Sequence, residues 1–154
     1  MIYNRTQTDV DNAISIRANK IQKGLELSAD EISIMERGTI TINTLNRIED
    51  KQDELKNLIN QMGYFNTKTI FNRQWSYNDF FDEVNFNRIL GNLRILKNAF
   101  FVYSNTPPIP TANYSYQNIN DLEKILYDMD IMITDIKSRY RQCGTFECGE
   151  ANEN

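Results

Sequence analysis

The sequence predicts an all-α protein: an elongated bundle of three long helices, with shorter helices and a short irregular C-terminal tail. One five-residue pattern (cap residue, apolar residue, Asn, charged residue, apolar residue) occurs three times, at residues 44–48, 85–89 and 118–122. Apolar residues follow each copy mostly at steps of three and four, which places them on one helix face. We therefore expect three helix starts of one design and, because the starts match, an antiparallel bundle.

The composition is that of one globular domain of ordinary size. The chain has 154 residues, of which 40% are hydrophobic and 25% charged. A net charge of −4 and a pI of about 4.9 argue against nucleic acid and anionic membranes, which both attract clustered Lys and Arg. No apolar run approaches the roughly 20 residues of a membrane span. Residues 1–11 lack the apolar stretch of a signal peptide, so we expect folding in the cytosol.

The residue types needed for common catalytic and metal sites are scarce. Histidine is absent, which removes the commonest general base and zinc ligand. Cys143 and Cys148 cannot complete a zinc site alone. We interpret them as reduced or incidental thiols, with a local disulfide as the alternative that a cytosolic origin disfavours. Asp79, Asp82 and Glu83 suit a helix N-terminus better than an acid/base pair. The sequence thus predicts no metal, no cofactor and no enzymatic activity.

Two short helices are expected before the first pattern. Residues 6–23 form the first, with Thr6 and Asp9 spaced as a capping box. The second covers residues 28–38 and opens with a similar Ser-x-x-Glu signal. Residues 39–42 alternate β-branched side chains, which predicts either a short strand or an extended linker.

Three long helices are expected from the patterns onward. The first covers residues 44–62 and has an apolar seam with one polar member, Gln52. The second starts at Asn85 and ends before a proline-rich loop at residues 106–116. The last covers residues 118–140, and its apolar steps of three and four continue without a break. Its seam is either intramolecular core or a coiled-coil contact with a neighbouring subunit.

A second start signal repeats on a larger scale. The Ser-x-x-Glu of residues 28–31 is matched by a Ser-x-x-Asp at residues 76–79, which predicts a short helix over residues 77–84. We therefore divide the chain into an N-terminal unit, a second unit that ends in the long C-terminal helix, and a tail, all within one compact domain. These parts are residues 1–72, 73–142 and 143–154.

Several segments, taken in order, carry a family resemblance. They are residues 3–10, 37–39 with 44–49, 75–81 leading into 86–89 and Asn92, 120–126, and 140–150. In this order they resemble small virion structural proteins of tailed phages and prophages of Gram-positive and gut bacteria. The resemblance covers most of the chain. It departs in the second pattern, where Leu90 stands in place of the usual acidic residue.

The resemblance implies a tail, baseplate or neck component that acts through protein contacts. Its implied partners are other virion structural proteins and further copies of itself, as a homo-oligomer or multi-copy ring, and its implied location is the virion after synthesis in the host cytoplasm. The first alternative is a cellular helical adaptor that binds one protein partner. The second is an enzyme of unrecognised type, which the absence of histidine disfavours.

Six residues are candidates for assembly or packing. Both arginines could bridge helices or subunits through a carboxylate, or remain solvated or paired within the chain. Both asparagines are expected to cap or bind turns locally. The tryptophan is either a core anchor or an interface hot spot, and the phenylalanine belongs to the terminal segment of the resemblance. They are Asn46, Arg47, Trp75, Asn87, Arg88 and Phe146.

Overall fold

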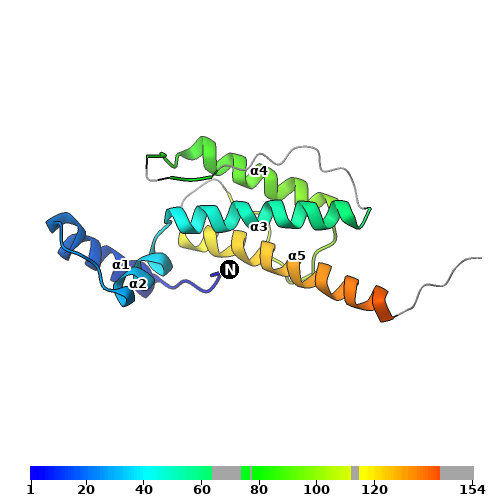
Figure 1. Ribbon diagram of the computed structural model, residues 1–154, viewed down its shortest axis with the longest axis horizontal. Helices are drawn as coiled ribbons and strands as arrows, with labels where there is room; N and C mark the ends of the chain where they lie inside the picture. The colour runs from blue at the N-terminus through cyan, green and yellow to red at the C-terminus, as the bar shows by residue number, and fades with distance from the viewer. Residues whose placement is uncertain (64–73, 77, 112–114, 143–154) are drawn as a thin grey trace, which may run out of the picture.

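The computed structural model describes residues 1–63, 74–76, 78–111 and 115–142 (Figure 1). All regular elements in these residues are helical, which confirms the all-α prediction and shows that residues 39–42 form no strand. The α-helices are α1 (Gln7–Asn19), α2 (Ala29–Gly38), α3 (Ile42–Gln61), α4 (Glu83–Ala99) and α5 (Tyr116–Gln142), and a 3-10 helix, η1 (Ile21–Lys23), follows α1. No helix in the described ranges is both long enough and apolar enough to cross a membrane.

The first two α-helices form a hairpin at one end of the molecule (Figure 1). The predicted capping boxes of Thr6 with Asp9 and of Ser28 with Glu31 are both present. The helices approach closely where α2 ends. A Cβ atom on Gly38 would lie 2.1 Å from the carbonyl oxygen of Asp9 and 2.5 Å from Cβ of Ala13. Only glycine therefore permits this crossing.

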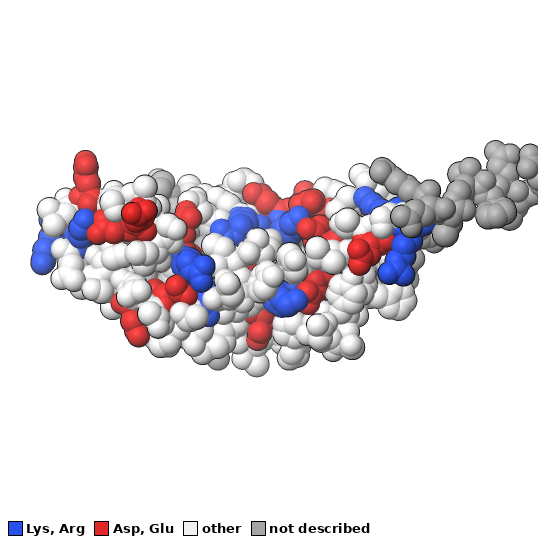
Figure 2. Space-filling view, turned by 90° about the horizontal axis from the view of Figure 1, so that it is seen from below, with Lys and Arg blue, Asp and Glu red and all other residues white. Residues whose placement is uncertain are grey.

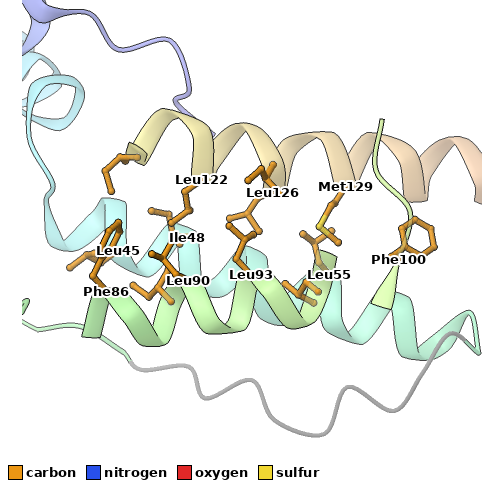
Figure 3. Packing of buried hydrophobic residues seen from close by; sticks show 14 of the residues in the cluster. Leu45, Ile48, Leu55, Phe86, Leu90, Leu93, Phe100, Leu122, Leu126 and Met129 are labelled. Carbon is orange, nitrogen blue, oxygen red and sulfur yellow. The ribbon is translucent and has the colours of Figure 1, made fainter. Parts of the chain in front are cut away.

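Helices α3, α4 and α5 run in the same direction, so the antiparallel prediction is wrong (Figures 1 and 3). Contacts between α3 and α5 advance together along both helices, from Arg47 with Glu123 to Lys51 with Asp130. A parallel arrangement needs long returns between helices. The segments 62–82 and 100–115 can supply them, because extended chain spans about 3.3 Å per residue against 1.5 Å in a helix.

The core lies between these three helices, and Figure 3 shows its side chains meeting from Leu45 and Phe86 near the helix starts to Leu55 and Met129 further along. Each fully buried Leu or Ile contributes about 1.5–3 kcal/mol. The polar seam residue Gln52 is also buried: its Nε2 donates to the carbonyl of Ile89 at 2.9 Å, and its Oε1 accepts from Asn92 at 3.3 Å. The core residues are Leu45, Ile48, Leu55, Ile59, Trp75, Phe86, Ile89, Leu90, Leu93, Leu96, Phe100, Ile119, Leu122, Ile125, Leu126, Met129 and Ile133.

The helices of the described residues pack in two groups. Helix α3 packs on α4 and α5, whereas α1 and α2 pack on each other. The division into units 1–72 and 73–142 stays a prediction. The short helix predicted over residues 77–84 is not formed in its described part, because residues 79–82 are non-helical and α4 begins at Glu83. The Ser76 and Asp79 side chains still bond each other, at 3.0 Å.

Candidate assembly site

The three long helices begin with one capping geometry, placed three residues earlier than predicted. We expected Thr44, Asn85 and Asn118 to be the caps. Their backbone N–H groups instead donate to side-chain oxygens of the residue three positions before. The donor–acceptor distances are 3.2 Å to Thr41 Oγ1, 2.8 Å to Asp82 Oδ1 and 3.1 Å to Ser115 Oγ. Each five-residue pattern therefore lies inside its helix, and both of its apolar residues are buried in the core.

Two asparagines of the pattern each hold the backbone of a distant residue. Oδ1 of Asn46 accepts from the N–H of Trp75 at 2.7 Å, and its Nδ2 donates to the Trp75 carbonyl at 3.2 Å. Asn120 makes the same pair of bonds with Arg5, at 3.2 and 2.9 Å. We call this arrangement an Asn clip: one side-chain amide pairs with the N–H and C=O of a single residue. Two of the three patterns form one.

A glutamate three residues after each clip asparagine holds the side chain of the clipped residue. Nε1 of Trp75 donates to Oε1 of Glu49 at 2.7 Å. A guanidinium nitrogen of Arg5, Nη1, donates to Oε2 of Glu123. Both glutamates are almost completely buried. One helical turn therefore fixes the backbone and the side chain of the clipped residue together.

The arginines of the pattern neutralise these buried glutamates. Arg88 on α4 forms a two-pronged pair with Glu49 on α3, with N–O distances of 2.8 and 2.5 Å. Arg47 on α3 donates through Nε and Nη2 to Oε1 of Glu123 on α5, at 3.1 and 2.8 Å. An uncompensated buried carboxylate is costly, and paired cations with several hydrogen bonds remove that cost. The network joins α4 to α3 and α3 to α5.

The second pattern keeps its asparagine, Asn87, but forms no clip among the described residues. Leu90 stands where the glutamate would be, and Asp121 stands where the arginine of the third pattern would be. The acid and the base are therefore replaced together, and among the described residues no ion pair of this kind links α4 to α5. Asn87 is exposed, and its amide forms no hydrogen bond with any residue in the described ranges.

The structure thus brings four of the six candidate residues together: Asn46, Arg47, Trp75 and Arg88 all belong to this network. The asparagine contact is a long-range one and not the local cap that we expected. Trp75 is part of the core, as one of its two interpretations proposed. Asn87 stands apart from the network. Phe146 lies outside the described residues, as do Cys143 and Cys148.

Sequence reasoning missed four members of the network, namely Arg5, Glu49, Asn120 and Glu123. A signal for three of them was present, because Asn-x-x-Glu occurs in the first and third patterns. Arg5 left no comparable signal, since its partners are more than a hundred residues away. Its Nη2 atom is buried without a hydrogen-bond partner among the described residues.

The hairpin has separate electrostatic contacts. The backbone N–H and hydroxyl of Thr6, together with Arg37, hold the pKa of Asp9 below its ordinary value. Lys20 and the Ser28 backbone do the same for the pKa of Glu31. In each case the hydrogen bonds favour the ionised carboxylate. Both acids therefore stabilise the hairpin in their charged form.

The rest of the described surface indicates no particular ligand. Lys and Arg side chains are interspersed with Asp and Glu on the face shown in Figure 2. Within the described ranges, no group of three or more Cys, Asp or Glu residues is arranged to hold a metal ion. No family model, no curated protein and no solved structure matches this chain.

Proposed function

We propose that the chain is a structural component of a phage or phage-derived particle, in the tail, baseplate or neck, and that it acts through protein–protein contacts. The order of the sequence motifs supports the phage origin. An elongated bundle of three long helices would serve as the rigid body, and the hairpin as a contact surface.

The observation that carries the assembly role is the apolar surface of the hairpin. Ile14 is 58% exposed, Leu25 53% and Ile32 48%, whereas Ala13 is the only buried residue of α1. Ile32 and Ile21 also line one groove of about 300 Å³. Several large apolar side chains exposed on one small element pair are typical of a surface that a partner covers. Burial in an assembly would remove this surface from water.

The proposal is tested by locating the chain in purified particles. Particles are isolated from infected or induced cells by density gradient and examined by mass spectrometry. We expect a fixed stoichiometry relative to the other virion proteins. The Ile32→Asp variant should be lost from the particles, because it introduces charge into the apolar surface. Ser33→Asp, at the neighbouring exposed position of α2, is the matched control and should be retained.

A cellular adaptor is the alternative function. It predicts a chain that is absent from purified particles and that binds a single host protein in uninfected cells. That pair of results would replace the virion proposal.

A further inference from the structure

Both filled clips hold the same kind of segment. Arg5 immediately precedes the capping box of Thr6 and Asp9, and Trp75 immediately precedes the Ser76 and Asp79 contact. In both segments the N–H of the Ser or Thr donates to the Asp carboxylate at 2.7 Å. The residue before it has an N–H and C=O that no helix uses. The clip supplies partners for both groups.

The described chain contains a third segment of this kind. Leu27 immediately precedes the capping box of Ser28 and Glu31, in which the Ser28 N–H donates to Glu31 at 2.9 Å. Within the described residues, the N–H and C=O of Leu27 form no hydrogen bond. Leu27 lies at the start of α2, on the hairpin that projects from the bundle (Figure 1).

Among the described residues, one asparagine of the patterns therefore holds no segment, and one segment of this kind is held by no asparagine. Asn87 has the register of Asn46 and Asn120 on its helix, and its exposed amide is unpaired within the described ranges. We propose that Leu27 of one copy docks on Asn87 of a second copy. Oδ1 of Asn87 would accept from the Leu27 N–H, and Nδ2 would donate to its C=O.

The side chains agree with this pairing. Trp75 and Arg5 each offer an N–H donor to a glutamate, whereas Leu27 has none to offer. In the second pattern Leu90 replaces the glutamate and is fully buried in the chain's own core, so no carboxylate there needs a donor. Near Asn87, Val84 is 76% exposed, so an apolar side chain would find an apolar neighbour there. Val84 lies three residues before Asn87 and thus on the same side of α4.

The Leu27 segment of a second copy is a better occupant of the Asn87 position than the chain's own Arg5 or Trp75 segment would be. Exchanging Arg5 or Trp75 into the Asn87 position would leave a buried glutamate without one of its donors. Docking of the Leu27 segment breaks no hydrogen bond to a buried glutamate. Since the segment and the clip lie on different surfaces, the contact is head-to-tail, and repetition gives a closed ring or a filament. The inference rests on the proposed assembly role and names the neighbour within it.

The test uses full-length chains and light scattering over a concentration series. The wild type should grow beyond a dimer as concentration rises. Asn87→Ala removes the clip, and Leu27→Pro removes the N–H that it binds. Asn87→Ala should associate at least tenfold more weakly, the effect expected for two lost hydrogen bonds, and Leu27→Pro, which loses one of the two, should associate several-fold more weakly. Asn98→Ala, at another exposed asparagine of α4, is the matched control and should associate like the wild type.

Mixing the two variants gives the decisive result. The Asn87→Ala chain keeps its segment and the Leu27→Pro chain keeps its clip, so the mixture should form a one-to-one dimer and nothing larger. Self-association of Asn87→Ala at wild-type strength would overturn the inference. So would a wild-type monomer whose Asn87 side-chain NH₂ signals do not shift on concentration. If that monomer is nevertheless found in particles, the proposed function stands and only this contact is wrong.

Discussion

The bundle and the hairpin start their helices with the same chemistry but bury very different groups. The bundle encloses a continuous apolar core and two buried glutamates, of which Glu49 pairs with Arg88 and Glu123 with Arg5 and Arg47. The hairpin buries little more than Ala13 and Gly38, and its ion pairs of Arg37 with Asp9 and Lys20 with Glu31 are partly exposed. Such pairs contribute little to stability. Capping and charge pairing are thus shared by both regions, and burial makes the difference between them.

The largest effect is expected from breaking the buried network in the bundle. Glu123→Leu should lower the free energy of unfolding by about 3–5 kcal/mol, because Arg5 would remain buried without its carboxylate. Urea denaturation measures this loss. The double variant with Arg5→Leu should recover part of it, since only Arg47, which is partly exposed, would then lack its carboxylate. A double variant as unstable as the single one would contradict this account.

In the hairpin, the largest effect is expected at the close crossing. Gly38→Ala should cost about 3 kcal/mol, because its Cβ would overlap the Asp9 carbonyl and Ala13. The loss should appear in hydrogen exchange of α1 and α2 and leave α3 to α5 protected. Gly91→Ala is the control: a Cβ there meets nothing within 4 Å, and the change should stabilise α4 by about 0.5–1 kcal/mol.

A smaller effect distinguishes a filled clip from the unpaired asparagine. Asn46→Ala removes two hydrogen bonds to the Trp75 backbone and should cost about 2 kcal/mol. Asn87→Ala should change the stability of the monomer by less than about 0.5 kcal/mol, since its side chain is exposed. Thermal unfolding at low concentration compares the two variants. Equal losses would show that the clip geometry adds nothing to the bundle.

The smallest effect is the pH dependence of the hairpin. The pKa values of Asp9 and Glu31 are lowered on folding, so the unfolded state binds protons first as pH falls. The ordinary pKa values are 3.8 for Asp9 and 4.5 for Glu31. The stability that the two carboxylates contribute is therefore present above about pH 4.5, and it is lost as the pH falls below these values. Helical chemical shifts of α1 and α2 should report this loss. In the double variant Asp9→Asn with Glu31→Gln, these shifts should be independent of pH over that range.

Sequence reasoning worked best where an interaction is local. The capping boxes at Thr6 and Ser28, the end of α2 at Gly38 and the buried faces of the long helices all depend on residues three or four positions apart. The caps of the long helices were placed three residues too late. At those starts, one polar residue occupies the true cap position and another stands three residues later, inside the helix. The spacing of the apolar residues alone does not show which of the two is the cap.

The amino-acid sequence by itself determined that the chain forms helices, where the first ones begin and which faces they bury, because capping and periodicity act over one or two turns. Only the tertiary structure decided that α3, α4 and α5 run parallel and that Asn46 and Asn120 hold residues 29 and 115 positions away. Those contacts depend on where the returning chain lies beside the helices. Within the described residues, the same arrangement leaves the Asn87 amide and the Leu27 backbone without hydrogen bonds, and no local pattern predicts this.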